Sequence, residues 1–143
     1  MNQFGCPFAK DPKSPRAGTG GPAPNTTFKS CDGQTITRTG DGGIPDEIGK
    51  PHQRITNDAG TLSMANTGQP QSGGSQFFIN VADNVRLDPA NNRWGYAVFG
   101  YVIEGMEVVD EIVSVKTGPQ GKLRSDVPMV PIVIKKMSRV TYD

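Results

Sequence analysis

The stretch S-G-G-S-Q-F-F-I-N-V, residues 72–81, places two adjacent phenylalanines after a run of glycine and serine. Side chains of a β-strand alternate between its two faces. One face would carry the apolar residues Phe77, Ile79 and Val81. The other would carry Gln76, Phe78 and Asn80. A face that mixes an aromatic ring with two amides is neither ordinary core nor ordinary solvated surface. The stretch therefore predicts a strand with one core face and one face that contacts something specific.

The surrounding chain is typical of a mainly β protein with one helix. Residues 1–50 are rich in turn residues and are interpreted as one long loop system. Met106, Val109 and Ile112 or Val113 recur at helical spacing, which predicts a helix over 105–115. Runs of apolar and β-branched residues predict the strands 60–66, 75–81, 96–102 and 131–140.

Length and composition bound the possible functions. A chain of 143 residues with 18 glycines and 12 prolines is expected to form a single domain, 1–143, with many turns. The 15 Lys+Arg and 14 Asp+Glu leave a net charge of +1, which favours neither nucleic acid nor an anionic membrane as partner. Cys6 and Cys31 are expected to be reduced. No apolar stretch approaches the roughly 20 residues of a membrane span, so a cytoplasmic location is predicted.

Several motifs fail as sites of other chemistries. A-G-T-G-G-P lacks the lysine of a phosphate-binding loop, and D-G-G-I-P-D-E does not space its oxygen ligands as a calcium loop does. Ser75 does not lie in a nucleophile elbow, and His52 is interpreted as an exposed loop residue. These failures exclude NTPase, hydrolase and metal-dependent functions, and no cofactor is predicted.

Three segments carry a resemblance to a known family: G-T-L-S-M-A-N, G-S-Q-F-F-I-N-V and V-F-G-Y-V-I-E-G-M-E-V-V. Their order and wording resemble the cyclophilin family of peptidyl-prolyl cis-trans isomerases. W-G-Y-A-V-F-G, K-T-G and D-V-P-M-V-P-I-V-I are similar to its bacterial branch. The resemblance covers essentially the whole chain and is strongest from residue 60 onward.

The resemblance implies a fold, an antiparallel β-barrel with a peptide groove on its outer wall. Cyclophilins have eight strands and two helices, and this chain matches the C-terminal two-thirds of that domain. It is therefore expected to retain one helix and to lack the first two strands and the first helix. The strand 131–140 would normally pair with the missing first strand, so an incomplete barrel or closure by another chain is expected.

The resemblance also implies a substrate-binding site. By the family pattern, an apolar pocket for the substrate proline would be formed by Met1, Phe78, Leu87 and Tyr96. The polar rim would be organised by Gln3 and Gln76, and the substrate backbone would pair with Ala65, Asn66 and Thr67. Gly18 and Thr19 match the family's glycine loop beside the groove. The partners implied are proline-containing peptides or unfolded proteins. Arg86 stands where many members carry a tryptophan that contacts cyclosporin, which implies weak binding of that ligand.

The function implied is acceleration of X-Pro isomerisation during protein folding. The family's catalytic arginine belongs to a Phe-His-Arg segment that this chain does not contain, so no catalytic residue is assigned. Arg16, Arg38 and Arg54 do not lie in a matching motif. Three interpretations stay open: a prolyl isomerase, a binding module that holds proline-containing peptides without catalysis, and a fragment without stable activity.

Overall fold

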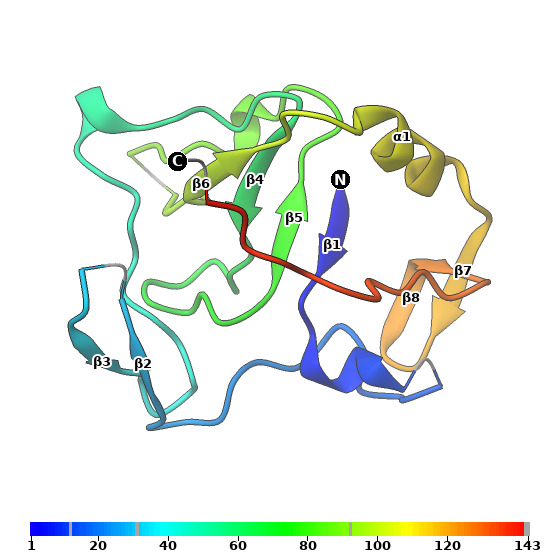
Figure 1. Cartoon of the computed structure of the whole chain (residues 1–143), viewed down its shortest axis with the longest axis horizontal. Coiled ribbons are helices and arrows are strands. Elements are labelled where there is room, and N and C mark those ends of the chain that lie inside the picture. Colours follow the sequence, from blue (N-terminus) through cyan, green and yellow to red (C-terminus); the bar gives the residue numbers. More distant parts are fainter. Residues whose placement is uncertain (12, 31, 92, 142–143) are drawn as a thin grey trace.

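The computed structural model of the chain describes residues 1–11, 13–30, 32–91 and 93–141. Its centre is a four-stranded antiparallel sheet, with one two-stranded hairpin on either side in the view of Figure 1. The sheet contains, in spatial order, β1 (Asn2–Phe4), β5 (Phe77–Ile79), β4 (Thr61–Met64) and β6 (Val98–Tyr101). The hairpins are β2 (Thr27–Lys29) with β3 (Thr35–Thr37), and β7 (Thr117–Gln120) with β8 (Leu123–Pro128).

Helices are few and short in the part of the chain that is described. The α-helix α1 spans Met106–Ser114, and Val109 is its buried residue. The side-chain amide of Asn2 donates a hydrogen bond to the carbonyl of Val109 at 2.9 Å, which attaches α1 to β1. The short 3₁₀ helices are η1 (Pro7–Lys10), η2 (Pro51–Gln53) and η3 (Val85–Leu87). No described helix is long and apolar enough to cross a membrane.

The strand periodicity in 72–81 is confirmed, but the prediction of which face is core is wrong. Phe78 is 2% exposed and Asn80 is fully buried. Phe77, Ile79 and Val81 are half-buried. The two faces of β5 differ in which parts of the chain cover them. The loop at Asn57 lies over the Phe78 face through hydrogen bonds described below, whereas Phe77 packs its ring against those of Phe4 and Phe99 at centroid distances of 5.9 and 6.3 Å.

Most other predicted elements are confirmed, with shorter bounds. The strands predicted over 60–66, 75–81 and 96–102 appear as β4, β5 and β6, and the helix predicted over 105–115 appears as α1. The loop prediction for 1–50 is wrong in part, because this region contains β1, η1 and the hairpin β2–β3. The register places Phe78 of β5 opposite both Gln3 of β1 and Ser63 of β4.

The strand predicted over 131–140 is not formed. A strand needs a neighbouring backbone to pair with, and no backbone ladder joins this segment to the described residues. Figure 1 shows it as an extended red trace without an arrow. Most of its apolar side chains are exposed, with Val133 at 67%, Met137 at 76% and Val140 at 68%, whereas Ile132 is half-buried. The alternation in the sequence is therefore present without the sheet that it predicts.

Candidate functional site

The predicted apolar pocket is largely assembled on the buried face of β5. The rings of Phe78 and Tyr96 meet edge to face, with centroids 5.5 Å apart and an interplanar angle of 76°, a favourable aromatic arrangement. The backbone N–H of Tyr96 donates to the carbonyl of Leu87 at 3.0 Å, so the end of η3 lies beside this ring pair. Three of the four predicted pocket residues thus come together around Phe78.

The fourth predicted pocket residue is less well placed. Met1 lies one residue before β1, and its side chain is 51% exposed. We find no hydrogen bond in the described chain that ties it to the other three pocket residues. The structure therefore brings together Phe78, Leu87 and Tyr96, and the place of Met1 in the pocket stays a prediction.

The two glutamines form a hydrogen-bonded rim next to Phe78. Gln3 donates from Nε2 to Oε1 of Gln76 at 2.9 Å, which connects β1 to the residue that precedes β5. Gln76 in turn donates from its own Nε2 to the carbonyls of Gly18 and Gly20, at 3.2 and 2.8 Å. The amide hydrogens of Gln76 are thus used to hold the glycine loop, and Gln76 organises the rim rather than pointing freely outward.

The glycine loop itself is closed by local hydrogen bonds. The hydroxyl and the backbone N–H of Thr19 both donate to the carbonyl of Arg16, at 2.8 and 3.1 Å. Thr19 is exposed and Gly18 is half-buried. The loop therefore presents an exposed hydroxyl-bearing residue beside the Gln3–Gln76 pair.

The segment 65–67 connects the rim to the aromatic pocket. The backbone N–H of Ala65 donates to the carbonyl of Gln76 at 3.0 Å. The side-chain amide of Asn66 donates to the carbonyl of Gly95, the residue before Tyr96, at 2.8 Å. The backbone N–H of Thr67 donates to the hydroxyl of Ser72 at 3.0 Å. The structure therefore brings the predicted rim and pocket residues, other than Met1, into one connected region.

A buried polar cluster behind the pocket was missed by the sequence analysis. Asn57, Ser63 and Asn80 are completely buried, on the same side of the sheet as Phe78. The hydroxyl of Ser63 donates to Oδ1 of Asn57 at 2.6 Å, and Asn57 reaches Asp88, 31 residues away. The one available signal was Asn80, an amide on the face of Phe78 in the predicted strand. Asn57 lies in a loop without periodicity and gave no signal.

Two hollows adjoin the site without coinciding with it. The larger has a volume of about 230 Å³, and Asn66 is the predicted site residue that lines it, together with Met64, Ala97, Phe99 and others. The smaller has a volume of about 130 Å³, and Tyr96 lines it beside Pro89 and Arg54. Phe78 lines neither hollow. The candidate site is therefore best described by its side chains and their hydrogen bonds.

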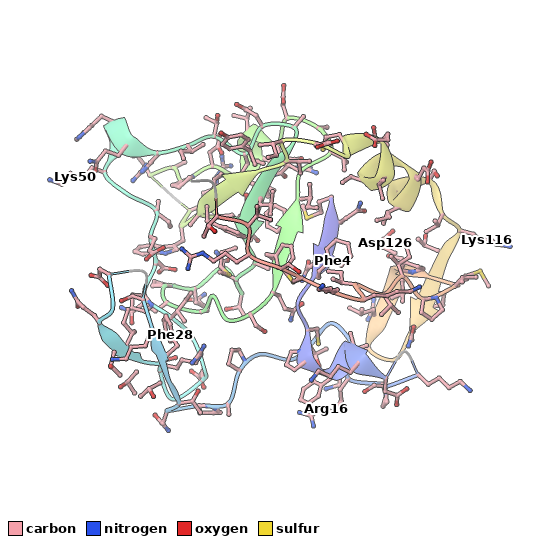
Figure 2. All side chains as sticks on the ribbon, in the orientation of Figure 1. Phe4, Arg16, Phe28, Lys50, Lys116 and Asp126 are labelled. Carbon is pink, nitrogen blue, oxygen red and sulfur yellow. The ribbon has the colours of Figure 1, made fainter. Side chains whose placement is uncertain are left out.

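Two of the three arginines named in the sequence analysis stack on aromatic rings outside the pocket. Arg16 lies over the ring of Phe8 at 3.7 Å, and Arg38 lies over the ring of Phe28 at 4.5 Å. Figure 2 shows Arg16 near η1 and Phe28 on the separate hairpin β2–β3, both away from the strand that carries Phe4. Arg54 borders the smaller hollow. His52 is exposed. Among the described residues, His, Cys, Asp and Glu side chains form no group of three that could hold a metal ion.

Cys6 lies beside the rim as a free, half-buried thiol; Cys31 lies outside the described residues. The backbone N–H of Gly20 donates to Sγ of Cys6 at 3.3 Å. Partial burial raises the pKa of this thiol, but backbone N–H groups, that of Gly20 foremost, lower it more, so its pKa lies below the ordinary value. The folded state thus favours the thiolate.

The lowered pKa of Cys6 predicts that a larger fraction of this thiol is ionised near neutral pH in the native chain than in the unfolded chain, which favours its alkylation. The folded chain should bind fewer protons than the unfolded chain in the pH window between the two pKa values. Stability should therefore rise with pH through that window and be lost as pH falls through the folded pKa. We expect the rate of Cys6 alkylation by iodoacetamide to reach half its maximum at a lower pH in the native chain than in the unfolded chain. The readout is mass spectrometry of the peptide that contains Cys6.

The same chain in concentrated urea is the control for the Cys6 experiment. There the backbone N–H groups no longer converge on Sγ, and the midpoint should return to about pH 8.5. A native midpoint equal to or above that in urea would show that the Gly20 contact does not stabilise the thiolate.

Comparison with known proteins adds independent evidence. A family model described as "Cyclophilin type peptidyl-prolyl cis-trans isomerase/CLD" matches residues 6–139. The peptidyl-prolyl cis-trans isomerase cyp18 of Streptomyces antibioticus is 50% identical over 84 residues, which is 57% of this chain and 50% of that protein. Peptidyl-prolyl cis-trans isomerase B of Escherichia coli K12 is 44% identical over 87 residues, 59% of this chain and 52% of that protein. The chain thus spans about half the length of these relatives.

A solved structure is similar over most of the chain. It is a cyclophilin-type peptidyl-prolyl cis-trans isomerase from Cryptosporidium parvum, crystallised in the presence of the dipeptide Ala-Pro. The TM-score is 0.54 at 27% sequence identity, and the match covers 89% of this chain and 60% of that one. A second crystal structure of the same protein matches with the same TM-score at 26% identity.

Proposed function

The chain belongs to the cyclophilin-type peptidyl-prolyl cis-trans isomerase family, and from that premise we propose that it accelerates X-Pro isomerisation in folding proteins. The observation that carries the proposal is the edge-to-face pair of Phe78 and Tyr96, with Leu87 beside it and the Gln3–Gln76 rim on the same strand pair. The proline ring of the substrate would lie in the apolar pocket, and its backbone would lie along residues 65–67.

The reaction asks little of the protein in chemical terms. An X-Pro bond isomerises over a barrier of about 18–20 kcal/mol, in tens to hundreds of seconds. A thousandfold acceleration requires about 4 kcal/mol of preferential stabilisation of the twisted transition state. Phe78, Leu87 and Tyr96 would exclude water from the proline ring, which favours loss of amide resonance. The rim amides would hold the flanking peptide in place.

The proline specificity of the proposed site has support from outside this chain. The C. parvum neighbour was crystallised with Ala-Pro, a dipeptide that ends in proline. By analogy, proline-containing peptides and unfolded proteins are the proposed partners. Arg86 is exposed and precedes Leu87 in η3, and we propose that cyclosporin binds weakly because a charged side chain replaces an indole there. We also propose that the sheet belongs to a barrel of the family type and that the location is cytoplasmic.

A titration with an Ala-Ala-Pro-Phe peptide tests the proposed function. We expect the amide resonances of Ala65, Asn66, Thr67, Gln76 and Tyr96 to shift in ¹⁵N spectra of the 143-residue chain, while those of the hairpin β2–β3 stay in place. Exchange spectroscopy on the peptide measures catalysis as faster cis–trans interconversion. Shifts without faster exchange would support the alternative, a module that binds proline-containing peptides.

The matched control is the same peptide with alanine in place of proline. It keeps the backbone and the flanking residues but removes the ring that the pocket is proposed to hold. We expect its dissociation constant to be roughly tenfold higher, since burial of a small apolar ring contributes about 1–2 kcal/mol. Equal affinity for the two peptides would contradict a proline pocket at Phe78.

A further inference from the structure

The buried amide of Asn57 joins three separate parts of the chain behind the proposed pocket. Its Oδ1 accepts hydrogen bonds from Ser63 of β4 at 2.6 Å and from Asn80, directly after β5, at 3.3 Å. Its Nδ2 donates to Oδ1 of Asp88 at 2.9 Å and to the carbonyl of Tyr96 at 3.3 Å. One side chain that is fully buried therefore contacts the sheet, the end of η3 and the backbone of a pocket residue.

The backbone of Asn57 strengthens the same connections. Its N–H donates to Oδ1 of Asp88 at 2.8 Å, so that carboxylate oxygen accepts two hydrogen bonds from one residue. Its carbonyl accepts from the backbone N–H of Asn84 at 2.9 Å, just before η3. A buried amide with both oxygen and nitrogen satisfied fixes the orientation of its partners, because each displaced partner loses a buried hydrogen bond.

The elements that Asn57 joins are the ones that carry the pocket. Phe78 lies opposite Ser63 in the sheet. Leu87 directly precedes Asp88, and its carbonyl accepts the hydrogen bond from Tyr96. The distance between the ring of Phe78 and the Leu87–Tyr96 wall therefore depends on the Ser63–Asn57–Asp88 and Ser63–Asn57–Tyr96 connections.

We propose that Asn57 is a positioning residue that sets the width of the proline pocket by holding Tyr96 and Asp88 at a fixed distance from the sheet. It does not touch the substrate, because its side chain is fully buried. The proposal rests on the proposed function in so far as it assigns these three residues to substrate binding. Its structural content, the coupling of Asn57 to the Phe78–Tyr96 ring pair, stands apart from that function.

The variant Asn57→Asp tests the proposal with little change in volume. The acceptor for Ser63 and Asn80 remains, but the two Nδ2 donations are lost and a carboxylate faces Oδ1 of Asp88. We expect the nuclear Overhauser effect between the rings of Phe78 and Tyr96 to weaken or vanish. The dissociation constant for the Ala-Ala-Pro-Phe peptide should rise roughly tenfold, as for the loss of one or two buried hydrogen bonds.

The matched control is Thr61→Val in the same cluster. The hydroxyl of Thr61 accepts from Asn80 at 2.9 Å and donates to the carbonyl of Asp58 at 2.7 Å. Its loss destabilises the network without removing a contact to Asp88 or Tyr96. We expect Thr61→Val to lower the urea concentration at the midpoint of unfolding. The nuclear Overhauser effect between the Phe78 and Tyr96 rings and the peptide affinity should both stay within about twofold. If the network acted only through stability, both variants would weaken the nuclear Overhauser effect and the peptide affinity to the same extent. That result would overturn the proposal.

A second variant covers the case in which Asn57→Asp does not fold. Asp88→Ala removes the acceptor from the η3 side of the same connection, and Asp88 is half-buried rather than fully buried. Like Asn57→Asp, it should weaken the nuclear Overhauser effect between the Phe78 and Tyr96 rings and lower the peptide affinity. Retention of both would also overturn the proposal. If the unmodified chain binds no proline peptide, the proposed function fails, and the nuclear Overhauser effect between the two rings alone still decides whether Asn57 positions the pocket.

Discussion

Replacement of Phe78 by alanine is expected to lower the free energy of unfolding by about 3–5 kcal/mol, the usual range for a buried phenylalanine, and to abolish peptide binding. Phe78 is 2% exposed and packs edge to face on Tyr96. Its removal leaves a cavity in the wall against which the proline ring is proposed to pack. The stability effect is measured by urea unfolding followed by tryptophan fluorescence, since the chain contains a single tryptophan, Trp94. Peptide affinity is measured by the titration described above.

The neighbouring Phe77→Ala variant is the control for this prediction. It removes the same ring one position away, from the half-buried face of the same strand. We expect it to cost about half as much stability, because less apolar area returns to water, and to leave the peptide affinity within about twofold. Phe78→Leu keeps the site filled if Phe78→Ala does not fold. Equal losses of stability and affinity for Phe77→Ala and Phe78→Ala would contradict the assignment of the two faces.

The variant Gly5→Ala is expected to destabilise the fold by about 3 kcal/mol or more, the sum of backbone strain and overpacking. Gly5 follows β1 with a φ of +89°, and a Cβ at this position would lie 2.1 Å from the carbonyl oxygen of Ser75. The hydroxyl of Ser75 donates to the carbonyl of Gly5 at 2.7 Å, so the two backbones are held in close contact. A methyl group would force β1 away from the start of β5 and disturb the Gln3–Gln76 rim. Urea unfolding measures the change.

Gly33→Ala separates the two causes of that loss. Gly33 has a φ of +83° and no atom within 4 Å of a built Cβ, so alanine there meets the conformational cost without the collision. We expect a loss of about 1–2 kcal/mol, at least about 1 kcal/mol less than for Gly5→Ala. If both variants lost the same stability, close packing of Gly5 against Ser75 would not be the cause of the larger effect.

Local patterns in the sequence predicted the helix α1 and the strand β5. The helix over 106–114 followed from apolar spacing, and its buried residue Val109 was one of those that defined the pattern. The alternation in 72–81 predicted a strand correctly, because strand periodicity is a property of the backbone itself. The pocket residues Phe78, Leu87 and Tyr96 came from the family resemblance, and the structure brings them together.

Features that depend on distant partners were not predictable in this way. Which face of β5 is core is decided by the loop at Asn57, whose partners lie 6 to 39 residues away in the sequence. Residues 131–140 have the alternation of a strand, yet a strand also needs a neighbouring backbone, which a one-dimensional pattern cannot supply. The Gln76 contacts to the glycine loop, 56 and 58 residues away, were hidden for the same reason.

The two faces of β5 impose opposite rules of mutational tolerance on neighbouring positions. At Phe77 and Ile79, half-buried among other apolar side chains, exchanges among residues of similar volume should be nearly neutral. At Asn80 the amide donates to Asn57, Thr61 and Ser63 and accepts from Asn84, so neither an aliphatic nor a charged side chain can replace it without leaving buried partners unpaired. In a randomised library across this strand, the folded variants should vary in side-chain size at Phe77 and Ile79 but should retain the amide at Asn80.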